Sequence, residues 1–309
     1  MLTLTPRTRV GAALLALGLG APGLSRANDP GTAGFLSLRL GAGARSAGMG
    51  DAQVSLAQDA TAAYWNPAGL AAVLGTSFTL MHDEWLSSVR METASLAHAT
   101  DVGTFGLHFS GMYLDEIERH TLPSSRDEGH FNVFEVAISG AYGRRLIQDW
   151  DVGLAFKGLY SKLDDKGASG WAADFGTRFR TRIPGLTFGG AVQNLGPKMK
   201  FVSEEFLLPI TGRAGADYQR GVARLSGSVT AAFDLVWPTD GDVRQHLGLE
   251  YMYRELAGVR VGYKGNYVSQ GLTFGVGLRK SSYRFDYAYA DIGNDLGNGH
   301  KLSLSIDLQ

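Results

Sequence analysis

The stretch KLSLSIDL, at residues 301–308, alternates apolar and polar side chains one by one. Its apolar set is Leu302, Leu304, Ile306 and Leu308, and serine or aspartate fills the positions between them. A period of two places one face of a β-strand in an apolar medium and the other face in a polar one. The stretch therefore predicts a strand that separates two environments.

The same alternation recurs along most of the chain after residue 75. It predicts about 14 strands, an even number of the kind found in bacterial outer-membrane barrels. The expected ranges are 76–83, 91–100, 103–113, 131–144, 150–162, 170–181, 186–194, 209–219, 223–237, 245–254, 257–264, 271–280, 282–290 and 300–308.

The connections between the expected strands differ in length in a regular way. Every second connection is tight, as at Asp101-Val102, Arg220-Gly221 and Lys280-Ser281. Four of the others are long and polar, at 114–130, 195–208, 238–245 and 291–299. Short turns on one rim and long loops on the other are typical of a barrel threaded through the outer membrane from the periplasmic side.

The polar face of the strands carries charges of both signs. A soluble barrel or sandwich would have to fill its interior with the apolar face, and a closed barrel of about 14 strands is too wide for that. We therefore expect an all-β protein, a transmembrane antiparallel β-barrel whose apolar face meets lipid. The charges expected to line its lumen are Glu135, Lys157, Asp174, Arg178, Glu250, Arg260, Arg284 and Asp286.

The first 27 residues have the pattern of a secretory signal peptide. Arg7 and Arg9 precede an apolar run at 10–24, and the small residues Ser25 and Ala27 fit a cleavage site. The run is shorter than the roughly 20 apolar residues of a transmembrane helix. Cleavage would remove three arginines and no acidic residue, so the net charge of −1 would become −4. We expect export through the Sec pathway to the outer membrane of a Gram-negative-type cell.

Residues 28–75 precede the first clear strand and lack a long apolar alternation. They contain GAGARSAGMG at 41–50 and DATAAYWNPAGL at 59–70. Small residues permit close approach of the backbone to a wall, and Asn66-Pro67 marks a tight turn. The sequence thus predicts a signal peptide at 1–27, a lumenal plug at 28–75 and the barrel at 76–309.

The stretch 43–71, preceded by GTAGFLSLRLG at 31–41, resembles the N-terminal signature of PorV/PorQ-type outer-membrane proteins, which are relatives of the FadL fatty-acid transporter. This resemblance implies a FadL-like barrel whose N-terminal hatch contains the NPAG segment. The hatch residues that it singles out are Gly48, Met49, Gly50, Trp65, Asn66, Pro67, Ala68 and Gly69.

Two roles go with the resemblance. One is service in type IX protein secretion or in surface attachment of cargo, with secreted proteins or secretion components as partners. The other is passive transport of hydrophobic small molecules such as fatty acids or hydrocarbons. The N-terminal signature favours the secretion role, and either role implies contact with outer-membrane lipid and lipopolysaccharide.

Enzymatic and cofactor-dependent roles find no motif in the chain. Cysteine is absent, which excludes thiolate metal sites and a cysteine nucleophile. The seven histidines show no HExxH or paired metal-ligand spacing, and GAGARSAGMG fits neither phosphate-binding glycine pattern. The small net charge gives no reason to expect nucleic acid as a partner. We expect a protein that is not an enzyme and holds no metal or cofactor.

Overall fold

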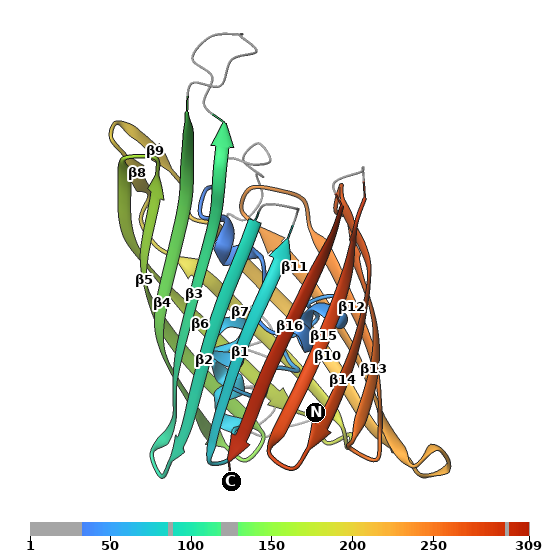
Figure 1. Cartoon of the computed structure of the whole chain (residues 1–309). Helices are drawn as coiled ribbons and strands as arrows, with labels where there is room; N and C mark the ends of the chain where they lie inside the picture. The colour runs from blue at the N-terminus through green and yellow to red at the C-terminus, as the bar shows by residue number, and fades with distance from the viewer. Residues whose placement is uncertain (1–32, 86–88, 119–128, 294–296, 309) are drawn as a thin grey trace.

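The computed structural model describes residues 33–85, 89–118, 129–293 and 297–308, so the expected signal peptide lies outside the described residues. Fourteen strands form one closed antiparallel barrel (Figure 1), which confirms the fold expected from the alternation. β1 (Thr76–Trp85) closes the barrel by pairing with β16 (Gly297–Leu308), from Thr76 opposite Leu308 to Glu84 opposite His300.

The other twelve barrel strands follow one another around the wall, each antiparallel to the next. They are β2 (Val89–Thr100), β3 (Gly103–Glu118), β4 (His130–Ile147), β5 (Trp150–Leu163), β6 (Lys166–Arg180), β7 (Leu186–Leu195), β10 (Thr211–Val222), β11 (Gly227–Pro238), β12 (Arg244–Tyr253), β13 (Ala257–Gly265), β14 (Gln270–Lys280) and β15 (Tyr283–Ile292).

The two rims of the barrel differ. We call one the short-turn rim; β1 begins there and β16 ends there (Figure 1). The connections between strands on this rim are 101–102, 148–149, 181–185, 223–226, 254–256 and 281–282. We call the other the long-loop rim. Its connection from β7 to β10 contains a separate antiparallel hairpin. The two strands of this hairpin are β8 (Met199–Phe201) and β9 (Glu204–Phe206).

Several expected boundaries were wrong. The turn expected at Arg220-Gly221 belongs to β10, which pairs with β11 as far as Val222 opposite Gly227, so the turn moves to 223–226 with a short helix η3 (Ala223–Leu225). The loop expected at 195–208 contains the β8-β9 hairpin, because buried Met199 packs with Phe35 and Leu208. Strands also extend into the loops expected at 114–130 and 291–299, since β3 ends at Glu118 and β16 begins at Gly297.

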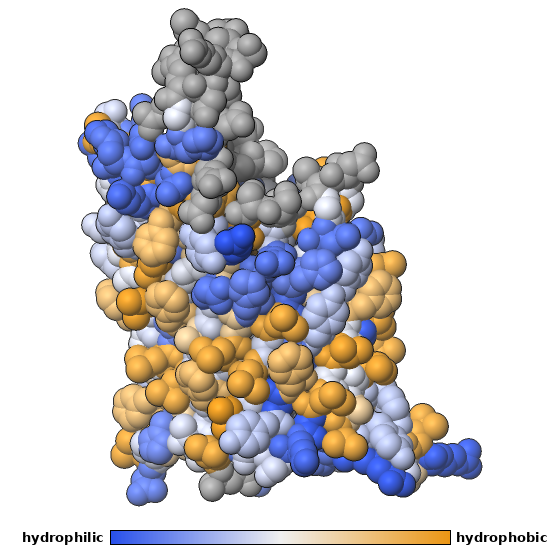
Figure 2. Space-filling view, viewed as in Figure 1, coloured by the Kyte–Doolittle hydropathy of each residue, from blue (hydrophilic) through white to orange (hydrophobic). Residues whose placement is uncertain are grey.

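The wall has an apolar outer face and a polar inner face. Leu249 and Phe285 point outward and are 47% and 51% exposed, whereas Ala137 and Ser303 point inward and are 3% exposed. Figure 2 shows hydrophobic residues gathered on the part of the barrel nearer the short-turn rim, below a band of hydrophilic residues. Among the described residues, no helix is long and apolar enough to cross a membrane.

Residues 33–75, which we call the inner segment, lie within the barrel (Figure 1). The segment folds into four short helices, η1 (Leu36–Arg39), α2 (Ala44–Gly48), α3 (Ala62–Trp65) and η2 (Pro67–Ala72). Its largest apolar cluster packs Trp65, Tyr64 and Leu70 against the wall residues Ala97, Ala141 and Ala155. The main packed core of the molecule therefore lies between the segment and the wall.

Candidate functional site

Asn66 connects the inner segment to the wall. Its side-chain oxygen accepts a hydrogen bond from the amide of Ala68 at 3.1 Å and so caps η2, whose first residue is Pro67. Its side-chain amide donates to the carbonyl of Thr177 in β6 at 3.1 Å. The expected turn at Asn66-Pro67 is thus a helix start whose polar residue is fully buried against the barrel.

Trp65 and Tyr64 tie distant parts of the inner segment together. The indole nitrogen of Trp65 donates to the carbonyl of Ala42 at 2.9 Å, and the Tyr64 hydroxyl donates to the carbonyl of Leu38 at 2.9 Å. From the wall, the side chain of Gln193 donates to the carbonyl of Tyr64 at 2.7 Å. Both aromatic residues are buried. They fix the segment as a compact unit.

The Gly48-Met49-Gly50 part of the hatch motif lies on the opposite side of the lumen from η2. Met49 is completely buried and packs with Ala52, Leu56 and the wall residue Ala232. Gly50 has a φ of 62°, and a side chain there would collide with the backbone of Tyr263. Only glycine combines this left-handed backbone with so close an approach.

A belt of inward-facing glycines lines the wall where the inner segment touches it. A side chain at any of these positions would meet atoms of the segment at or below ordinary contact distance. Gly153 faces Pro67 and Ala68, and Gly176 faces Asn66. The glycine belt takes one residue from each of nine strands: Gly106, Gly143, Gly153, Gly176, Gly189, Gly215, Gly248, Gly262 and Gly275.

A chain of ion pairs starts and ends on the inner segment. Arg45 of α2 contacts Glu250 at 2.7 Å, and Glu250 also contacts Arg260 at 2.5 Å. Arg260 contacts Asp286 at 2.8 Å, Asp286 contacts Arg284 at 3.0 Å, and Arg284 contacts Asp59 at 2.7 Å. We call these six residues the ion-pair chain. Four of the eight charges expected in the lumen belong to it.

The other four expected charges also point inward. Glu135 accepts hydrogen bonds from the amides of Leu36 and Ser37 at 3.3 and 2.9 Å. Arg178 donates to the carbonyl of Ser55 at 2.7 Å. Lys157 and Asp174 contact each other at 2.7 Å on the wall. The expected charges therefore contact the inner segment at three separate places, namely the ion-pair chain, Glu135 and Arg178. They do not form one site.

Sequence reasoning missed several wall residues that hold the segment. Asp234 accepts from the amides of Gln53 and Val54 at 2.8 and 2.9 Å. Lys301 donates to the carbonyl of Leu40 at 2.6 Å. Both occupy inward positions of alternating strands, so their side of the wall could have been read from the sequence. Their partners could not, because those lie 180 or more residues away in the chain.

Burial and neighbouring cations set the ionisation of two carboxyl groups on the inner segment. For Asp51, burial alone would raise the pKa, but Lys264, Lys301 and His246 outweigh it and lower the pKa to about 2. For Asp59, Arg284 and a hydrogen bond from Thr61 likewise outweigh burial and lower the pKa. Both groups are therefore ionised at neutral pH.

At the long-loop end of β1, β2 and β3 the inner wall carries an apolar cluster, with the buried carboxyl groups of Asp83 and Glu135 on the strands beside it. The apolar collar, as we call it, packs Leu40 and the partly buried Leu36 of the segment against five residues at the ends of β1, β2 and β3, namely Trp85, Val89, Met91, Met112 and Leu114. An apolar lining at this point is unfavourable for ions and favourable for hydrocarbon.

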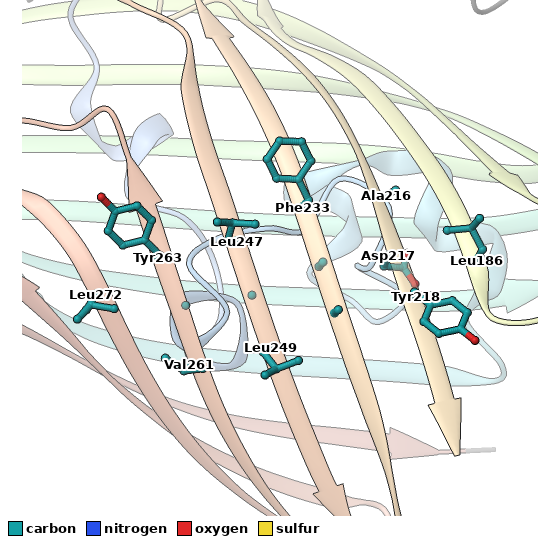
Figure 3. A pocket seen from close by; sticks show the side chains of 14 residues that line it. Leu186, Ala216, Asp217, Tyr218, Phe233, Leu247, Leu249, Val261, Tyr263 and Leu272 are labelled. Atoms are coloured by element: carbon teal, nitrogen blue, oxygen red, sulfur yellow. The ribbon is translucent and has the colours of Figure 1, made fainter. Parts of the chain in front are cut away.

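The outer wall has an apolar groove of approximately 450 Å³ across β7 and β10 to β14 (Figure 3). Tyr218, Phe233, Leu247 and Tyr263 project around it (Figure 3), and Ala231 also lines it. Because the groove lies on the apolar outer face, it belongs to the surface that would meet lipid. It is separate from the lumen.

The model of the uncharacterised protein family UPF0164 matches residues 21–207, which is more than half of the chain. The chain belongs to UPF0164. No curated protein matches it.

Solved structures show which barrels this UPF0164 member is similar to. The Pseudomonas putida toluene transporter TodX has a TM-score of 0.61 at 12% identity, over 86% of this chain and 97% of that chain. The Ralstonia pickettii toluene transporter TbuX has a TM-score of 0.57 at 15% identity, over 86% and 97%. The TodX deltaS2S3 mutant, a monoaromatic hydrocarbon channel, has a TM-score of 0.64 at 13% identity, over 87% of this chain and 99% of that chain. The fold of this chain is therefore that of the TodX and TbuX barrels, and at these identities the likeness concerns the fold alone.

Proposed function

We propose that this chain is an outer-membrane channel for small hydrophobic molecules, in which the inner segment closes the lumen to water-soluble solutes. The observation that carries the proposal is an apolar cluster on the inner wall of β1 to β3, next to the part of the lumen that the inner segment fills. An apolar collar lies towards the long-loop rim, and the glycine belt and ion-pair chain hold the segment across the rest of the barrel.

The closed part of the lumen opposes free passage of water and ions. The belt glycines bring the segment's backbone against the wall, and the ion-pair chain anchors α2 and Asp59 to β12, β13 and β15. Removing one partner of such a buried pair leaves an uncompensated charge, which is costly. The inner segment thus has the properties expected of a plug, and residues 33–75 are its described part.

The collar is the element suited to a hydrophobic solute. Met91 and Met112 are flexible, fully or almost fully buried side chains, and methionine adapts its shape readily to apolar ligands. The collar is packed in this structure, so passage requires its side chains to rearrange. The substrates named for the structural neighbours are toluene and monoaromatic hydrocarbons. We extend that substrate class to this chain.

An outer-membrane location fits the apolar outer face and the signal-peptide pattern at 1–27. The secretion-associated role rests on the N-terminal signature alone. Neither the family model nor the structural neighbours support a PorV/PorQ assignment, so the transport role is the one we propose.

Uptake of labelled toluene by intact cells tests this function. Cells making the chain should take up toluene faster than cells with an empty vector. Changing Met91→Gln and Met112→Gln together should reduce the rate, whereas Met252→Gln, near the short-turn rim, should leave it unchanged. Uptake equal to the vector control, with the barrel assembled in the outer membrane, would refute the proposal.

A further inference from the structure

The short-turn rim carries an excess of exposed basic side chains. Among its described residues, the exposed basic set is Arg144, Arg145, Arg182, Arg220, Arg224, Arg254 and Lys280, which we call the basic rim. The exposed acidic residues described on the same rim are Asp101, Asp149 and Glu255. On the long-loop rim the balance is reversed: the exposed acidic residues described there are Glu84, Asp164, Asp165, Glu204, Glu205, Asp242 and Asp291, against Arg90, Lys162, Lys166, Lys198 and Lys200.

Most of the basic rim is not used for folding. Within the described part of the chain, Arg144, Arg182, Arg220 and Arg224 make no ion pair with another side chain. By contrast, Arg180 lies on the same rim and pairs with the buried Asp151. Exposed cations without an internal partner are available to an anion outside the protein.

Exposed aliphatic side chains accompany these cations in the same turns. Leu146 and Ile147 follow Arg145, Ile183 follows Arg182, and Leu225 follows Arg224. The apolar belt of the outer wall continues down to this rim, where hydrophilic residues lie at its lower edge (Figure 2). A surface with exposed aliphatic residues next to Arg145, Arg182 and Arg224 matches the boundary between acyl chains and headgroups.

We propose that the basic rim binds the phosphate groups of anionic phospholipids in the leaflet on the short-turn side of the membrane. Arginine presents donors in a planar fork that matches phosphate, and cations at an anionic membrane surface are held by its negative potential. The aliphatic neighbours would enter the acyl region and keep the arginines at phosphate depth. The inference rests on the proposed location of the barrel in a membrane, but not on what the lumen transports.

Lipid selectivity of the reconstituted full chain tests the proposal. In phosphatidylcholine vesicles, trace spin-labelled phosphatidylglycerol should be immobilised at the protein more than spin-labelled phosphatidylcholine, by about fivefold given the attraction of several cations. Replacing Arg144, Arg182, Arg220 and Arg224 by Gln should bring the two lipids close to equality. Replacing Lys162, Lys166, Lys198 and Lys200 by Gln, an equal loss of charge on the long-loop rim, should preserve the selectivity.

A salt series on the unmodified chain keeps the test independent of variant folding. Raising the salt to about 1 M shortens the screening length to about 3 Å and should abolish the selectivity. Equal immobilisation of both lipids at low salt would overturn the proposal, as would equal effects of the two quadruple variants. Selectivity for anionic lipid that coexists with no toluene uptake would contradict the proposed transport and leave this inference intact. An acidic protein recovered on the basic rim, with no lipid selectivity, would assign the surface to another partner.

Discussion

Arg284 of β15 contacts Asp59 of the inner segment at 2.7 Å, across 225 residues of sequence. Asp59 lies seven residues before Asn66, whose amide donates to the carbonyl of Thr177 in β6. Strands on different sides of the barrel thus hold the same short stretch of the segment. The segment is integrated into the wall by polar contacts as well as by packing.

The glycine belt predicts that a single methyl group disturbs the plug. Gly153→Ala should push η2 away from β5, because the added carbon would collide with Pro67 and Ala68. We expect a loss of about 1–3 kcal/mol in the free energy of unfolding, as for other overpacked cores. Thermal unfolding of the purified barrel measures this loss. Gly158→Ala in the same strand is the matched control, since its nearest atom, the carbonyl oxygen of Ile138, is 4.0 Å away. Equal effects of the two changes would contradict the close packing.

The ion-pair chain predicts a large effect at Glu250. Glu250→Ala would leave Arg45 and Arg260 without their shared acceptor, and breaking a buried pair typically costs about 3–5 kcal/mol. Urea unfolding should show this loss. The control is Lys166→Ala at the exposed pair with Asp165, for which we expect only a small change because solvent screens the pair. A change of that small size at Glu250 would mean that the chain of pairs does not hold the segment.

The depressed pKa values on the inner segment predict acid opening. For Asp51 the pKa falls from an ordinary 3.8 to about 2 on folding, so its ionised form stabilises the docked segment. This stabilisation is complete above about pH 4 and is lost as the pH falls towards about 2. The ionic current through the reconstituted barrel should therefore stay low from pH 5 to 8 and rise only in acid.

The double variant Asp51→Asn with Asp59→Asn removes both titrating groups and should lose this acid step. A rise in current centred between pH 5 and 7 would lie above the range in which these two groups titrate. It would contradict the assignment to the two carboxylates.

Much of the barrel could be predicted from the sequence because each strand records its two environments residue by residue. In β16, for example, outward Leu302 and Leu304 alternate with inward Ser303 and Ser305. The same alternation predicts all fourteen strands of the barrel. The turn at 223–226 was misplaced because strand pairing, rather than local glycine, sets where β10 ends.

The site was harder to predict than the wall. The sequence indicated which charges face inward, but not that Glu250 would join Arg45 to Arg260 or that Glu135 would accept from Leu36 and Ser37. Such pairings depend on how the inner segment is rotated within the barrel. No local pattern in the chain encodes that rotation.

The central claim is that the inner segment closes the lumen of an otherwise complete barrel. Planar-bilayer recording of the mature chain and of a variant lacking residues 33–75 tests it most directly. Barrel stability comes from closed strand pairing and the apolar outer face, so the deletion variant should still assemble. We predict little ionic current through the full chain and a large, steady current through the deletion variant. A deletion variant that assembles and stays closed, or a full chain that conducts equally well, would contradict the claim.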